Sequence, residues 1–157
     1  MIKKAGGNFS NIAKEAITHC STCSMLQKIT SLESHSLQDY MSILEEKRPE
    51  ELLIYLEADN QLEKAVALIN RSTFVFDDHV CEFYKKHKKQ FPHDAEKYFC
   101  GRIDKNIINT GDRYYYTVAD SIKELKQINT KLAGEYLQQI RTEYKRRRNL
   151  IAILSNI

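Results

Sequence analysis

A chain of 157 residues has the size of one ordinary domain, and its 42% hydrophobic and 29% charged residues indicate a folded protein and exclude a disordered segment. No apolar run approaches the roughly 18 residues that span a bilayer. The first residues, "MIKKAGGNFSN", lack the apolar stretch of a secretory signal. The sequence therefore predicts a cytoplasmic protein with no membrane partner.

The net charge of +3 hides an imbalance along the chain. Residues 1–78 carry 8 Lys/Arg against 12 Asp/Glu, which is −4, whereas residues 79–157 carry 16 against 9, which is +7. A basic half attracts nucleic acid or an acidic partner, but charge balance alone describes only non-specific attraction. A nucleic-acid partner is therefore kept as an alternative.

The fold class follows from the scarcity of turn formers and from the apolar periodicity. The chain holds only 5 Gly and 2 Pro, and no run of β-branched residues alternates with period two between turn signals. Apolar residues recur instead at helical spacing. The sequence predicts an all-α protein, with residues 1–157 as a single domain and residues 1–9 as a flexible N-terminal segment.

Eight helices are predicted in chain order from apolar stripes, caps and prolines. They are expected at Ser10–Ile29, from Ser36, from Pro49, from Asn60, from Asp77, from Pro92, at Asp112–Ile128 and at Lys131–Arg148. Asp112 is expected to cap the seventh helix, and Gly111 is expected to end the sixth. The eighth helix either continues into Leu150 and Ile151 or breaks near Arg148.

The last two predicted helices are joined by the short segment "INTK", and short turns make antiparallel neighbours. Antiparallel pairs stacked in sequence build helical solenoids. We therefore expect seven or eight helices in stacked antiparallel pairs, as in an α-solenoid of the tetratricopeptide (TPR-like) kind. A compact helical bundle is the alternative.

Two stretches resemble known helical units. "ELLIYLEADNQLEKAVALIN" resembles a tetratricopeptide unit, in which small Ala residues let two helices approach closely. The stretch from "TGDRYYYTVAD" to "NLIAIL" resembles the C-terminal helical tail of bacterial SWIM zinc-finger proteins. The matched positions are Tyr115, Ala119, Leu125, Tyr136, Leu137, Ile140, Tyr144, Arg146, Arg147 and Leu150.

The resemblance covers the last third of the chain best, and the zinc motif of that family, a CxC followed by CxH, is absent. It therefore implies a helical tail domain that works within a larger protein or assembly, and it implies no zinc. No cofactor is predicted for this chain.

The sharpest metal candidate is "HCSTC", with His19, Cys20 and Cys23 as ligands. A structural zinc site needs four ligands, and no second CxxC or HxxxH follows. His79, Cys81 or Cys100 would complete the set only through tertiary folding. Because Cys20 and Cys23 also fit the apolar stripe of their helix, core packing is favoured over a metal site.

The candidates for binding nucleic acid are two basic stretches. One is "KKHKKQFPH", Lys85–His93, which contains the basic run Lys85–Lys89, and the other is the basic run Lys145–Arg148. A nucleic-acid site needs such runs to converge beside exposed aromatic residues. Contiguous charges on a helix fan out over more than half of its circumference, so each run is equally explained as a solvated helix face.

The run Tyr114–Tyr116 covers about 200° of a helix, so its three rings cannot all be buried. Tyr115 fits the buried stripe, and one of its neighbours is expected either to be an exposed interface anchor or, preferably, to pack on the preceding helix. The candidate interaction surface therefore consists of Tyr114, Tyr116, Lys145, Arg146, Arg147 and Arg148.

Enzyme classes have little support, because the chain has no Gly-rich phosphate loop, HExxH or GxSxG motif. We expect a non-enzymatic helical-repeat module that binds a protein partner, and the alternative is a nucleic-acid-associated module that uses the basic C-terminal half.

Overall fold

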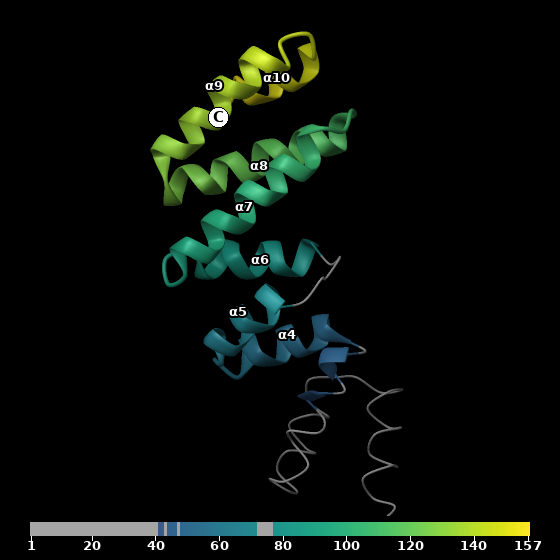
Figure 1. Ribbon diagram of the computed structural model, residues 1–157, viewed down its shortest axis with the longest axis vertical. Coiled ribbons are helices and arrows are strands. Elements are labelled where there is room, and N and C mark those ends of the chain that lie inside the picture. Colours follow the sequence, from purple (N-terminus) through teal and green to yellow (C-terminus); the bar gives the residue numbers. More distant parts are fainter. Residues whose placement is uncertain (1–40, 43, 47, 72–76) are drawn as a thin grey trace, which may run out of the picture. The chain divides into compact units, whose positions relative to one another are not determined.

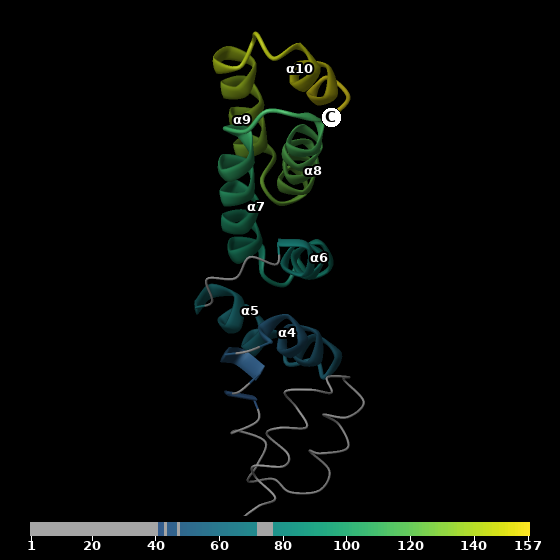
Figure 2. The same cartoon turned by 90° about the vertical axis from the view of Figure 1, so that its right-hand side faces the viewer.

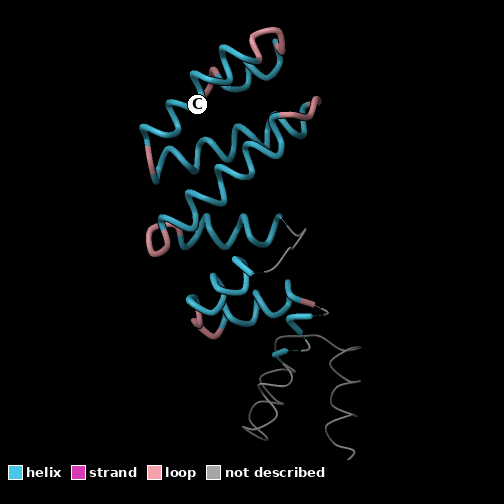
Figure 3. Tube along the Cα trace, viewed as in Figure 1, coloured by secondary structure: helices cyan, strands magenta, loops and turns pink. Residues whose placement is uncertain are grey.

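The computed structural model describes residues 41–42, 44–46, 48–71 and 77–157. Every regular element in these ranges is a helix, which confirms the all-α class for them (Figure 3). The expected flexible segment 1–9, the helix expected at 10–29 and most of the helix expected from residue 36 lie outside the described residues. The chain divides into two compact units, of which the first ends at Cys81 and the second begins at Glu82.

The first unit contains α4 (Pro49–Ala58) and α5 (Leu62–Arg71), which pack against each other (Figure 1). Both helices begin and end near the predicted points. Their buried side chains include Leu52, Leu53, Tyr55, Leu56, Leu62, Ala65 and Leu68. This pair is the stretch that resembles a tetratricopeptide unit, and the completely buried Ala65 is one of its small residues.

Local chemistry explains where α4 begins and how the chain turns between α4 and α5. Pro49 is the first residue of α4, where its missing N–H costs nothing, and Glu50 and Glu51 lie in the first turn, at the positive end of the helix dipole. Between the helices, Asn60 has a φ of 56°, a left-handed conformation that asparagine tolerates better than most residues.

The helix α6 (Asp77–His87) crosses the boundary between the units, and four further helices complete the second unit. They are α7 (Pro92–Ile107), α8 (Asp112–Ile128), α9 (Thr130–Glu143) and α10 (Arg148–Leu154). The central helix is α8, which packs against α7, α9 and α10. Figure 2 shows α7 and α9 in one layer and α8 and α10 in the other.

The core of the second unit consists of the apolar stripes that the sequence predicts. On α8, Tyr115, Val118, Ala119, Ile122 and Leu125 are all buried, as expected from their helical spacing. They meet buried side chains of the three neighbouring helices, among them Phe99, Ile103, Ala133, Ile140, Leu150 and Leu154. None of the described helices is long and apolar enough to cross a membrane.

The helix bounds agree with the prediction for α8 and differ at its two neighbours. The sixth predicted helix, α7, ends at Ile107, so Gly111 does not end it. Gly111 directly precedes α8 instead, with a φ of 120°. Asp112 is the first residue of α8, and no side chain caps this end. The predicted roles of Gly111 and Asp112 were therefore wrong, because the α7–α8 turn is longer than expected.

We expect opposite effects from placing alanine at two glycines of the second unit. Gly111→Ala should lower the free energy of unfolding by about 1–2 kcal/mol, because an L side chain rarely adopts its φ of 120°. Gly134→Ala should raise it by about 0.5–1 kcal/mol, because Gly134 lies within α9 and a Cβ there meets nothing within 4 Å. Urea unfolding, followed through the NMR amide signals of α8, measures both. Equal effects from the two substitutions would contradict the role of Gly111 in the turn.

Candidate functional site

The basic run Lys145–Arg148 lies where α9 turns into α10. Residues 144–146 form a turn after Glu143, and α10 begins at Arg148. Of the two predicted alternatives, the break near Arg148 is therefore the one that the structure has. A continuous helix over residues 130–154 would be about 37 Å long, whereas α8 is about 25 Å long. The break allows Leu150 and Leu154 to be buried at α8 instead of extending beyond it.

Arg147 holds this turn against the turn that joins α7 to α8. Its guanidinium donates hydrogen bonds to the backbone carbonyls of Ile107 at 2.6 Å, Asn109 at 2.8 Å and Ile108 at 3.4 Å. It also lies over the ring of Tyr144, 4.6 Å from the ring centroid. The carbonyls at the end of α7 have no partner within their helix and carry partial negative charge, so a cation is favourable there. Arg147 thus stabilises the end of α7.

The other three members of the run, Lys145, Arg146 and Arg148, are exposed. Among the described residues, no acidic side chain forms an ion pair with any of them. Their charges are therefore directed to solvent, unlike the charge of Arg147.

Exposed aromatic and aliphatic side chains lie on the adjoining α7–α8 turn and in the first turns of α8. Tyr114 is 38% and Tyr116 63% exposed, and both flank the buried Tyr115 in the first turns of α8. Ile108, whose carbonyl accepts from Arg147, is 68% exposed. We call these three residues, together with Lys145, Arg146 and Arg148, the turn edge. Figure 1 shows both turns on the same side of the second unit.

The second basic run, Lys85–Lys89, is partly neutralised by α8. Lys85 forms ion pairs with Asp120 at 3.1 Å and with Glu82 at 3.2 Å. Lys88 pairs with Glu124, and both side chains are largely buried. At least two cations of this run therefore stabilise the packing of the second unit, so the expected solvated helix face is wrong for Lys85 and Lys88.

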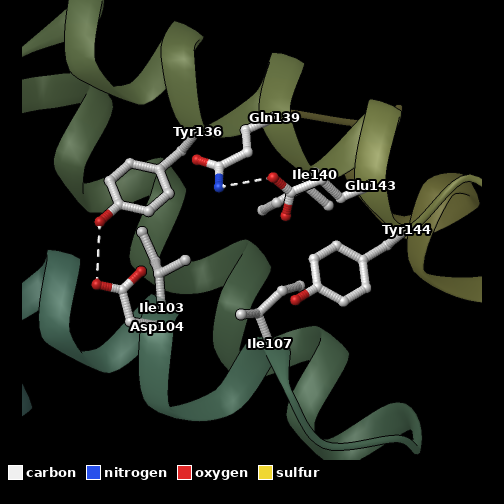
Figure 4. Close-up of a pocket in the computed structure, with 8 residues that line it drawn as sticks. All are labelled: Ile103, Asp104, Ile107, Tyr136, Gln139, Ile140, Glu143 and Tyr144. Atoms are coloured by element: carbon white, nitrogen blue, oxygen red, sulfur yellow. Dashed lines mark hydrogen bonds between the residues drawn. The ribbon is translucent and has the colours of Figure 1, made fainter.

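A small hollow lies between α7 and α9 (Figure 4). Its floor is apolar and its rim carries carboxylates, an amide and phenol rings. The lining residues are Ile103, Asp104, Ile107, Tyr136, Gln139, Ile140, Glu143 and Tyr144. We call it the α7–α9 hollow. Its volume of about 40 Å³ has room for about three waters, whereas sites for small molecules measure about 300–1,000 Å³.

Two hydrogen bonds order the rim of the hollow. The Tyr136 hydroxyl donates to Asp104 Oδ2 at 3.3 Å, and Gln139 Nε2 donates to Glu143 Oε1 at 3.1 Å (Figure 4). Burial is the main cause that raises the pKa of Tyr136 above its ordinary value, followed by the neighbouring Cys100 and Asp104. The rim therefore combines two carboxyl groups with two phenol rings.

Sequence analysis did not single out this hollow. The stripes included Ile103, Ile107, Tyr136, Ile140 and Tyr144 as core residues. Asp104 is more than thirty positions away from Gln139 and Glu143, so no local pattern in the sequence relates it to the other two polar residues of the rim. Only the packing of α7 and α9 on a common neighbour brings the two groups together.

The structure also places some of the metal candidates. His19, Cys20 and Cys23 lie outside the described residues. Within the described ranges, no three His, Cys, Asp or Glu side chains group as metal ligands would. Cys81 is buried, and burial is the main cause that raises the pKa of the Cys100 thiol. That thiol is therefore mostly protonated at neutral pH and is a poor nucleophile.

Comparison with known proteins identifies no relative: no family model matches the chain, and no curated protein or solved structure is significantly similar to it.

Proposed function

We propose that the chain is a non-enzymatic helical-repeat module that binds a protein partner through the turn edge. One observation carries the proposal: Arg147 joins two turns, and these turns and the adjoining start of α8 expose Ile108, two tyrosines and three cations. Tyr and Arg are the side chains most enriched among the residues that dominate binding energies at protein interfaces. The surplus of positive charge favours an acidic surface on the partner.

The proposed architecture is a TPR-like α-solenoid, and a compact bundle remains the alternative. The alternation of α7, α8, α9 and α10 between two layers supports the solenoid (Figure 2). The resemblance to SWIM zinc-finger tails supports a module that works within a larger protein or assembly. A cytoplasmic setting and the lack of a cofactor are further parts of the proposal, which rest on the sequence alone. Matched positions such as Tyr115 and Ile140 are buried, and Arg147 ties the helices together.

The alternative is a nucleic-acid-associated module. It is favoured by one specific observation, which is that Lys145, Arg146 and Arg148 are exposed and that Tyr116 is exposed as well, because cations suit phosphates and an exposed ring suits stacked bases. Against it, Lys85 and Lys88 of the other basic run are engaged by acidic side chains. Three free cations make a small electrostatic footprint, so we rank this function second.

Cross-linking from the turn edge tests the proposed function. A photoreactive phenylalanine analogue at position 116 should form a discrete covalent adduct with a protein in extract from the source cells. The same group at position 131 should not, because Lys131 lies on α9 away from the turn edge and is itself 90% exposed. The adduct at position 116 should survive nuclease treatment, and the triple variant Lys145→Glu, Arg146→Glu, Arg148→Glu should reduce its yield. Equal yields at positions 116 and 131 would contradict the proposal.

Salt dependence separates the two functions. If the three cations contact phosphates, affinity for fluorescent RNA or DNA should fall about 20- to 40-fold between 0.05 and 0.2 M salt. The same triple variant should then abolish binding, whereas Arg147 is kept so that the fold is preserved. We expect no binding to nucleic acid at low salt. Steeply salt-dependent micromolar binding would instead establish the alternative.

A further inference from the structure

The α7–α9 hollow is separate from the turn edge and has its own chemistry. Three isoleucines close its floor, and the exposed carboxylates of Asp104 and Glu143 belong to opposite walls. The ring of Tyr136 lies beside Asp104, and the ring of Tyr144 lies at the opposite end, beyond Glu143 (Figure 4). An apolar floor under an acidic and aromatic rim suits a side chain with an apolar stem and a positive head.

The charge balance of the hollow favours a cation. Two carboxylates and no cationic side chain are among the residues that line it. Arg147 lies over Tyr144 at one end, where its guanidinium donates to the α7 carbonyls. Burial is the main cause that raises the pKa of Tyr136, and Asp104 makes a smaller contribution.

The size and shape of the hollow distinguish among cations. Room for about three waters excludes a cofactor or nucleotide and admits the end of one side chain. A guanidinium is planar, pairs with carboxylates through two parallel hydrogen bonds and stacks on aromatic rings. The ammonium of lysine is compact and strongly hydrated, so it gains less from such a site. The chain itself already places one guanidinium on Tyr144.

We propose that the α7–α9 hollow binds a single arginine side chain presented by a partner protein, with Asp104 and Glu143 as its acidic contacts and the tyrosines as its aromatic walls. The assignment of this arginine to a protein depends on the proposed function, because that function supplies the protein partner. The site itself is independent of the turn edge, so each can fail without the other.

The test uses a small probe and the whole chain. Nα-acetyl-L-arginine amide, titrated into ¹⁵N-labelled protein, should shift the backbone amide signals around Asp104, Tyr136 and Glu143 saturably. The dissociation constant should be on the order of millimolar, as befits one side chain. Nα-acetyl-citrulline amide has nearly the same shape without the charge and should bind at least tenfold more weakly.

Matched variants complete the test. The double variant Asp104→Asn, Glu143→Gln should weaken binding of the arginine probe at least tenfold. The control Asp112→Asn, Glu135→Gln removes the same charge from residues that do not line the hollow and should leave binding unchanged. Equal binding of the citrulline probe, or equal losses in both double variants, would overturn the inference.

Two combinations of results separate this inference from the proposed function. A failure of the arginine probe beside a specific adduct at position 116 would remove the hollow and leave the turn edge standing. The opposite result would leave the hollow as the binding site and remove the turn edge.

Discussion

Replacing Arg147 with alanine is expected to lower the free energy of unfolding of the second unit by about 2–3 kcal/mol. The substitution removes hydrogen bonds to the carbonyls of Ile107 and Asn109, which lie partly buried at the end of α7. Hydrogen bonds that involve a charged group contribute about 1.5–3 kcal/mol each, and partial exposure reduces their sum. Urea unfolding followed through amide signals of α8 measures the loss.

Two companion variants make the result specific to the geometry of Arg147. Arg147→Lys keeps the charge but cannot reach several carbonyls with a planar fork, so it should recover less than half of the lost free energy. Arg146→Ala removes a neighbouring exposed cation and should change the free energy of unfolding by less than about 0.5 kcal/mol. If Arg146→Ala and Arg147→Ala were equally mild, Arg147 would not hold the two turns together.

The second large effect is expected at the ion pair of Lys88 and Glu124. The side chains are only 15% and 12% exposed, so loss of one partner leaves the other charge largely buried. Glu124→Ala should therefore lower the free energy of unfolding by about 3 kcal/mol. The measurement is again urea unfolding at neutral pH and moderate salt.

Removing both charges is the matched control for this pair. Burying two charges costs desolvation free energy that their attraction only partly offsets, so apolar replacements of similar volume are often neutral. The double variant Lys88→Met, Glu124→Leu should therefore lie within about 1 kcal/mol of the original chain. A double variant as unstable as Glu124→Ala would show that the pair contributes net stability.

The comparison of sequence and structure is clearest at the helix starts and at the α9–α10 turn. Pro49 and Pro92 each begin a helix as predicted, because the missing N–H and fixed φ of proline are local properties. Likewise, α8 has the predicted bounds, and its apolar spacing identifies its buried face. The turn after Glu143 could not be placed in this way, because it depends on contacts with distant helices.

The same contrast between local signals and contacts between distant helices applies to the candidate site. The sequence alone identified Tyr114, Tyr116, Lys145, Arg146 and Arg148 as candidate surface residues, and all five are exposed. The basic run Lys145–Arg148 contains no local signal that Arg147, and not its neighbours, binds backbone carbonyls.

Sequence by itself determined the helical class, the starts of most helices and their apolar faces, because these follow from spacings of three and four residues and from the chemistry of single residues. Only the tertiary structure decided that Arg147 binds carbonyls about forty positions away and that Lys88 meets Glu124. It alone brings Asp104 opposite Glu143 across a hollow. These features depend on contacts between separate helices, and such contacts leave no periodic signal in a single chain.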